Sequence, residues 1–282
     1  MSGLRKFDLK VLGVDFSGAR TDRHTWLTSG VLEDDRLILN DCRSVTRADL
    51  ADMLSAEPGP AVAALDFPFS VPVDFATRWS SEAVTMSDLW AVAERMELGE
   101  FVSLRDEFVA LHGEPKRVGD LFYPESYSCL HKANPNLVPM TFRGMQMLAS
   151  LWACGCSVPP LIRPDEKPVV LLEAMPGAAL RAFGLPFKGY KNGVKAQELR
   201  RQILDGLSDR STVSLRNLGD FREMCLHYHD CLDSVVAAVV AALWVRDPDS
   251  FRCPPIAGAT DFNPEVLLEG WLYAPALLHA AD

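Results

Sequence analysis

The sequence predicts an α/β fold in which helices flank a mixed central sheet and a helical insertion separates two of its strands. The first observation is a set of short, almost wholly apolar runs at 11–15, 61–65 and 169–173, which are typical of buried strands. The second is that each run ends in an acid or directly precedes one. The third is a helix predicted from about 230 to 245, which must pack centrally because it is apolar on every face.

The N-terminal third begins with strands. The run at 11–15 predicts a buried strand that ends at a Phe-Ser-Gly turn. Residues 25–31 have strand composition, and 36–40 return after an acidic turn, so we expect a hairpin. A helix then opens at Thr46, where Asp49 takes the place of the usual Glu or Gln of a capping box.

Residues 70–168 form the predicted helical insertion. It follows the strand at 61–65 and contains helical stretches that begin near 87 and cover about 101–111 and 142–152. Because the strand pattern resumes at 169–173, we expect the insertion to belong to the surrounding domain and not to fold separately.

The C-terminal part adds helical sequence at 196–207 before the long apolar helix. Residues 247–282 are rich in proline and glycine and are predicted to form a C-terminal extension. We expect one domain over residues 1–282, which is enough chain to bury a core without disulfides or a structural metal.

The composition excludes some classes of function. The 28 Lys and Arg against 38 Asp and Glu give a net charge of −10, which argues against a protein that coats nucleic acid non-specifically. The uncharged run between Asp233 and Arg246 is shorter than the ~20 residues of a membrane helix, so no membrane partner is expected. The seven cysteines, an odd number, predict a reducing compartment, and we expect a cytoplasmic protein.

Five acids are the candidate catalytic residues. Asp15, Asp66 and Glu173 follow the three buried strands, and the carboxyl ends of such strands form the crevice where α/β proteins bind ligands. Asp230 and Asp233 lie three residues apart at the start of the apolar helix, where the helix dipole stabilises anions. Carboxylates that converge repel one another unless a cation lies between them, and all-oxygen sites suit Mg²⁺ or Mn²⁺. Two such ions can activate water for phosphodiester cleavage.

Each acid also has an ordinary structural interpretation. An acid at a strand end is most often a turn residue or a helix cap, and Asp230 is a natural N-cap. His227, His229 and Cys231 lie beside it and weakly suggest zinc or a nucleophilic pair, although polar capping is the simpler interpretation. The pattern of acids is therefore more informative than any one of them.

Several segments resemble a known family. These are 13–18, 65–69, 173–176 and 229–238, together with Met140-Thr-Phe-Arg-Gly-Met. They are similar to the domain of unknown function 429, a family described as predicted nucleases of the RNase H fold, and the resemblance covers most of the chain. The order of the predicted strands is also similar to that of the bacterial Holliday-junction resolvases of the same superfamily.

The resemblance implies an RNase H-like sheet and a metal-dependent nuclease that acts on nucleic acid. Resolvases carry an Asp after the first strand, an acid after the fourth and an Asp-x-x-Asp on the last helix. Asp15, Asp66, Asp230 and Asp233 occupy those places and would be the metal ligands, with Glu173 as an additional acid. The resemblance to resolvases further implies a homodimer. Family members often carry His where this chain has Met at 175, so an acid–base role there is not expected.

Candidate substrate-binding groups lie near these acids. Residues 181–222 contain nine Lys and Arg against four acids, a local charge of +5 between Glu173 and Asp230. This segment is either a solvated basic face or a track for phosphates. The side chains expected to contact substrate are Ser17, Arg143, Lys188, Lys191 and Lys195.

Two other functions remain alternatives. Sugar kinases and actin-like ATPases share the strand topology and a Gly-x-Asp turn, so a nucleotide-binding phosphotransferase is one of them. Those proteins need a second Asp-Gly phosphate loop, which we do not find in this sequence. The other is a non-catalytic binding or scaffold protein that retains the fold. Carboxylates that are spread apart or engaged in salt bridges would favour it.

Overall fold

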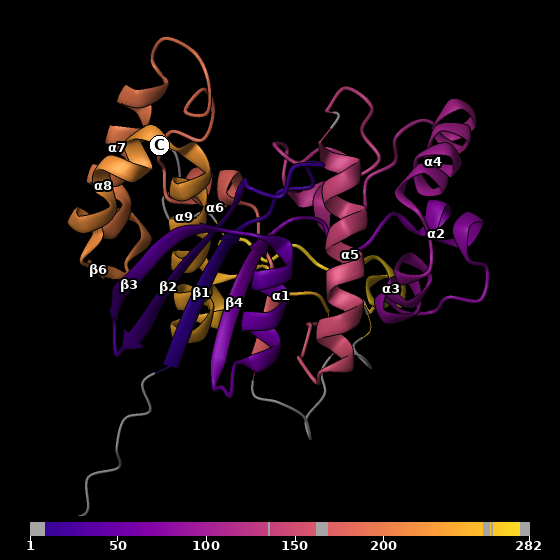
Figure 1. Cartoon of the computed structure of the whole chain (residues 1–282), viewed down its shortest axis with the longest axis horizontal. Helices are drawn as coiled ribbons and strands as arrows, with labels where there is room; N and C mark the ends of the chain where they lie inside the picture. The colour runs from indigo at the N-terminus through magenta and orange to yellow at the C-terminus, as the bar shows by residue number, and fades with distance from the viewer. Residues whose placement is uncertain (1–8, 135, 162–168, 256–259, 261, 277–282) are drawn as a thin grey trace, which may run out of the picture.

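The computed structural model of the chain describes residues 9–134, 136–161, 169–255, 260 and 262–276. Six strands form one mixed sheet in the order β5-β4-β1-β2-β3-β6 (Figure 1). The strands are β1 (Leu9–Asp15), β2 (Thr25–Glu33), β3 (Arg36–Val45), β4 (Ala61–Asp66), β5 (Val169–Glu173) and β6 (Ser214–Arg216). The predicted α/β class, with a mixed sheet flanked by helices, is therefore confirmed.

The strand directions explain the order of the sheet. β1, β2 and β3 pair antiparallel as a meander, which needs no crossover helix: residues 16–24 join β1 to β2, and a turn at 34–35 joins β2 to β3. β4 and β5 run parallel to β1, and the connections that return the chain to this edge carry helices. The β1–β4 register places Asp15 beside Asp66, so two of the predicted acids lie side by side at the ends of their strands.

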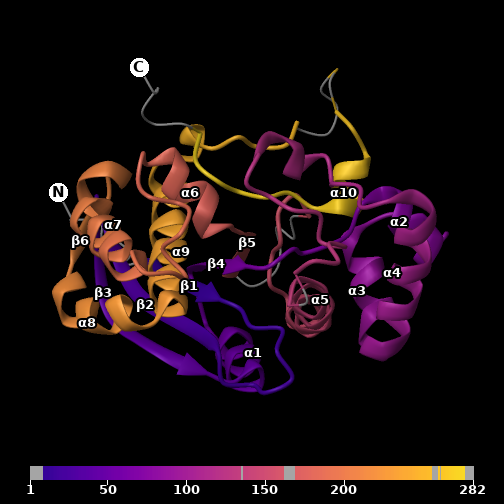
Figure 2. The same cartoon turned by 90° about the horizontal axis from the view of Figure 1, so that it is seen from above.

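Helices cover both faces of the sheet (Figures 1 and 2). Because side chains alternate along a strand, Val11 packs with the helices of one face and Leu12 with those of the other. The first face carries α6 (Pro176–Ala182), α7 (Ala196–Ser211), α8 (Leu218–His227) and α9 (His229–Arg246). The second face carries α1 (Arg47–Ala56) and α5 (Leu137–Ala153).

Helix α9 is the central helix of the first face. It packs on β1, β2 and β4, and its residues from Cys231 to Leu243 are all buried, which explains why it is apolar all round. The approach to β1 is close at Gly13, where an added Cβ would lie 2.1 Å from the Ala238 nitrogen and 2.2 Å from the Ser234 carbonyl oxygen. Only glycine permits this contact, which fixes the height of α9 above the sheet.

The segment between β4 and β5 is helical, as predicted. It contains α2 (Val73–Trp79), α3 (Met86–Glu94), α4 (Leu98–His112), the 3₁₀ helix η1 (Gly119–Phe122) and α5. Figure 2 shows α2, α3 and α4 at the end of the molecule opposite α7 and α8. Residues 162–168, the end of the predicted insertion, lie outside the described residues.

Five short helices and strands were not predicted, namely α2, α6, β6, α8 and α10 (Glu265–Glu269), and neither were the 3₁₀ helices η1 and η2 (Pro248–Ser250). They have three to ten residues each, and hydrophobic periodicity is hard to recognise over so few positions. The predicted C-terminal extension includes α10, which packs on α2 and α3. Among the described helices, none has both the length and the hydrophobicity that crossing a lipid bilayer requires.

Candidate functional site

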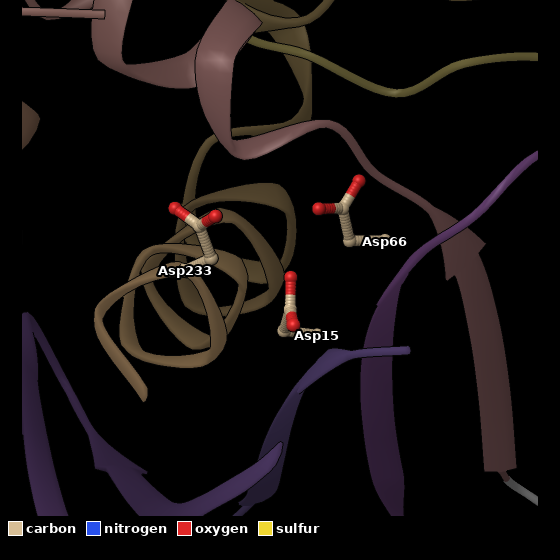
Figure 3. A group of neighbouring side chains, drawn as sticks. All are labelled: Asp15, Asp66 and Asp233. Carbon is tan, nitrogen blue, oxygen red and sulfur yellow. The ribbon is translucent and has the colours of Figure 1, made fainter. Parts of the chain in front are cut away.

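Three acids meet at one edge of the sheet (Figure 3). Asp15 and Asp66 end β1 and β4, and Asp233 comes from the beginning of α9. One carboxylate oxygen from each of the three lies within 4.8 Å of the others. The parallel register brings the two strand acids together, and the close approach of α9 at Gly13 brings the third. Sequence segments more than 160 residues apart thus form one cluster.

Burial makes this cluster electrostatically costly without a cation. Asp233 is fully buried, while Asp15 and Asp66 are partly exposed. Burial, together with the negative charge of Asp233, raises the pKa of Asp15 well above its usual value. Burial is also the main reason that the pKa of Asp66 is raised to about 7. In the metal-free protein, therefore, the cluster holds protons near neutral pH.

Two neighbouring residues hold Asp233. The Tyr190 hydroxyl donates to its Oδ1 at 2.8 Å, and the Lys191 ammonium lies 2.7 Å from its Oδ2. Although burial alone would lower the pKa of Lys191, the Asp233 carboxylate holds it well above its usual value. Lys191 thus acts as the local counter-ion, and its side chain is still 45 % exposed toward solvent.

The donor set suits a hard divalent cation. Carboxylate oxygens are the ligands that Mg²⁺ and Mn²⁺ prefer, and Asp15, Asp66 and Asp233 bring three of them together from rigid elements. The three carboxylates also carry more negative charge than Lys191 alone balances. The geometry therefore fits the predicted Mg²⁺ or Mn²⁺ ligands at three of the four positions.

Asp230, the fourth predicted ligand, lies outside this group of three. Its Oδ1 is 2.6 Å from Nδ1 of His229, the preceding residue. Asp230 occupies the first turn of α9 near the surface, whereas Asp233 points into the protein. Asp230 contributes to the site mainly by its charge, which helps to raise the pKa of Asp15.

Glu173 also lies outside the group, and its carboxylate is engaged by Arg117. The Arg117 guanidinium contacts both Glu173 oxygens, one of them at 2.8 Å, and the Phe69 backbone N–H donates to Glu173 Oε2 at 2.9 Å. Arg117 also makes two hydrogen bonds of 2.9 Å to Asp120. This buried network joins the end of β5 to the insertion, and it gives Glu173 a structural partner beside the acid cluster.

The predicted substrate-binding residues divide into two groups. Ser17 and Arg143 make contacts that hold the loop after β1. The Ser17 hydroxyl accepts a hydrogen bond from the Ala19 backbone N–H, and the Arg143 guanidinium contacts the Gly18 carbonyl. Lys188, Lys191 and Lys195 are exposed on the loop between α6 and α7. Only Lys191 among these five contacts the acid cluster.

The basic segment 181–222 is partly occupied by internal contacts. Arg200 donates to the carbonyls of Leu226 and Tyr190, at 2.8 and 2.6 Å. Arg222 pairs with Asp205 at 2.6 Å. The exposed Lys191 contacts Asp233 of the acid cluster, and no salt bridge or hydrogen bond to a protein group is found for the side chain of Lys188 or Lys195 among the described residues.

The sequence did not identify Tyr190 and Arg117 as site residues. Neither lies in a catalytic motif, and the contacts that matter span 43 residues for Tyr190 and 56 for Arg117. The one local signal was the concentration of basic residues in the segment 181–222, which contains Tyr190 but not Arg117.

A cavity of about 690 Å³ opens beside the acids. Asp66, Tyr190 and Lys191 line it at the acid cluster, and Glu125 and Tyr127 of the insertion also line it. A ligand that fills this cavity would therefore touch Asp66, the one member of the acid cluster among its lining residues.

The sequence comparisons identify the family. The model of the family described as "Protein of unknown function (DUF429)" matches residues 13–257, which is most of the chain. The chain belongs to the DUF429 family. The matched region of this DUF429 protein includes all three acids of the cluster and the whole insertion. Searches of curated proteins and of solved structures found no match.

Proposed function

We propose that this DUF429 protein is a metal-dependent hydrolase that cleaves phosphodiester bonds in nucleic acid. The observation that carries the proposal is the convergence of Asp15, Asp66 and Asp233 from two parallel strand ends and a buried helix. These oxygens come from strands and a buried helix, and a catalytic metal site needs such rigid elements because its geometry must be fixed. The ligands to Mg²⁺ or Mn²⁺ are these three carboxylates.

The chain's own residues have distinct tasks in this mechanism. Asp15 and Asp66 bind the cation in their ionised form, and Tyr190 orients the Asp233 carboxylate by its hydrogen bond. Lys191 pairs with Asp233 in the metal-free protein and, with Asp233 bound to a cation, would be free to hold a phosphate oxygen of the substrate, which its exposure allows. A divalent cation at this place supplies an activated water and stabilises charge on the phosphoryl oxygens.

The topology supports the same proposal. An antiparallel meander of β1, β2 and β3 with β4 and β5 added parallel to β1 resembles the RNase H-like order that the family resemblance implies. In that resemblance the acids follow the first and fourth strands and lie on the last long helix, as Asp15, Asp66 and Asp233 do here. Glu173 then has a supporting role through Arg117 and is not a ligand.

One observation favours the alternative of a non-catalytic binding protein. The Lys191–Asp233 ion pair places a cation of the protein itself in the acid cluster. In a scaffold protein this pair would be permanent and no metal would enter. The two functions are therefore distinguished by whether a divalent cation displaces Lys191.

The activity is tested by titrating Mg²⁺ and Mn²⁺ against DNA and RNA substrates that are single-stranded, double-stranded and branched. We expect cleavage that requires the metal and falls by roughly 10³-fold or more in Asp15→Asn, which removes a ligand charge. Asp209→Asn, the same change at an exposed position of α7, is the matched control and should cleave normally. If the wild type cleaves none of these substrates with either metal, the proposed activity is wrong.

A further inference from the structure

The cavity beside the acid cluster has features that the cleavage chemistry does not explain. Its volume of about 690 Å³ lies within the ~300–1,000 Å³ typical of small-ligand sites. Asp66 of the acid cluster lines it, and so do Glu125 and Tyr127 of the insertion. The cavity therefore offers room for a part of the substrate next to the bond that is cleaved.

Glu125 is the unusual group in this cavity. Its side chain is only 8 % exposed, and neither carboxylate oxygen has a hydrogen-bond partner among the described residues. The Arg181 guanidinium lies 3.5 Å from one oxygen, which balances the charge without making a hydrogen bond. Buried polar atoms are nearly always hydrogen-bonded in native proteins. Both oxygens are themselves buried, so a ligand in the cavity reaches them only when the Glu125 side chain turns toward it, and two adjacent acceptors then require a ligand that brings a pair of donors.

Tyr127 provides a flat apolar surface in the same cavity. Tyr127 is 65 % exposed, so much of its ring is uncovered by protein. One face stacks on His131, with ring centroids 4.9 Å apart and an angle of 18°, and Glu114 holds the His131 ring. The Tyr127 ring is thus fixed in orientation, as a platform for stacking must be.

From these two features we propose that the cavity binds one unpaired guanine base of the substrate strand. Guanine presents the N1–H and N2–H donors side by side on its Watson–Crick edge, and a carboxylate accepts such a pair in bidentate fashion. The base stacks on Tyr127, which is how proteins commonly hold single-stranded bases. That the base belongs to a nucleic-acid strand rests on the proposed function.

The other bases fit the carboxylate less well. Adenine and cytosine each place an acceptor nitrogen next to their amino group, and this acceptor would face a carboxylate oxygen. Uracil has one N–H between two carbonyl groups, so it offers a single donor. Hypoxanthine keeps the N1–H of guanine but lacks the N2 amino group, which makes inosine the most discriminating probe.

The test measures binding of nucleosides to the full chain in EDTA, by NMR or fluorescence titration. We expect guanosine to bind at least about tenfold more tightly than inosine, adenosine, cytidine or uridine, because the missing bond is charge-assisted. Glu125→Gln should remove the preference for guanosine over inosine, and Tyr127→Ala should weaken all five nucleosides. Glu223→Gln, an exposed acid on α8, is the matched control and should bind guanosine as the wild type does.

Equal affinities for guanosine and inosine in the wild type would overturn the inference, as would a lack of saturable guanosine binding. The wild-type comparison needs no variant, so it remains decisive if Glu125→Gln does not fold. The experiment omits divalent metal and is therefore independent of cleavage. Guanosine selectivity without nuclease activity would support the guanine site and contradict the proposed function. Cleavage without base selectivity would support the proposed function and contradict the guanine site.

Discussion

Removing the Arg117 side chain should destabilise the protein more than any comparable change at the surface. Arg117 is 3 % exposed and pairs with the equally buried Glu173 and Asp120. Arg117→Met keeps much of the side-chain volume but leaves both carboxylates buried without their counter-ion. Loss of one partner of a buried pair costs about 3–5 kcal/mol, which is a large part of the ~5–15 kcal/mol that stabilises a typical domain.

The deficit should also depend on pH. Burial already raises the pKa of Glu173, and Arg117 is the main group that lowers it again. Without Arg117 the folded-state pKa rises further above the unfolded-state value, so the variant gains stability when Glu173 is protonated. The stability difference from wild type should therefore shrink as the pH falls from 7 to 5.

Urea unfolding followed by tryptophan fluorescence measures both effects. The matched control is Arg222→Met, which breaks the ion pair with Asp205 at the surface and should cost less than about 1 kcal/mol. If Arg117→Met loses no more free energy of unfolding than Arg222→Met, then the network around Glu173 does not stabilise the junction of β5 and the insertion.

Three other results are expected. Gly13→Ala should lower the free energy of unfolding by about 1–3 kcal/mol and weaken Mn²⁺ binding, because the added Cβ would force α9 away from β1. Gly99→Ala is the control, because open space surrounds Gly99, and it should change neither quantity. Thermal unfolding with and without Mn²⁺ measures both effects. Because the pKa of Asp66 is about 7 when folded and 3.8 is its usual value, metal-free stability should fall by up to about 4 kcal/mol between pH 4 and 7. The rise in melting temperature on adding Mn²⁺ should grow over pH 6 to 8, and a stability independent of pH would contradict this. Lys191→Met should lower the metal-free melting temperature and increase the stabilisation by Mn²⁺; a variant that Mn²⁺ does not stabilise would favour the scaffold alternative.

The sequence alone was sufficient to predict the elements that have a strong hydrophobic pattern. The apolar runs of β1, β4 and β5 and the uniformly apolar α9 could be recognised because burial on both faces leaves a continuous hydrophobic stretch. The acids at the ends of these elements followed directly, since strands that run parallel end at the same edge of the sheet. For this reason the sequence predicted the Asp15–Asp66 proximity that the register creates.

Which of the five acids join the cluster could not be predicted in the same way. Asp230 and Asp233 are three residues apart on one helix, and only the rotation of α9 on the sheet determines which of them points inward. Glu173 has the same local signature as the two strand acids, but a distant arginine on the insertion engages it. Neither the helix rotation nor that long-range contact has a local signature in the sequence.

The most direct test of the central claim is a crystal structure of the full chain soaked with Mn²⁺, with the metal located by anomalous scattering. We predict one or more Mn²⁺ ions coordinated by Asp15, Asp66 and Asp233, with the Lys191 ammonium displaced from Asp233. Acids that remain metal-free at high Mn²⁺ concentration, with Lys191 still bonded to Asp233, would contradict the metal site and the hydrolase built on it.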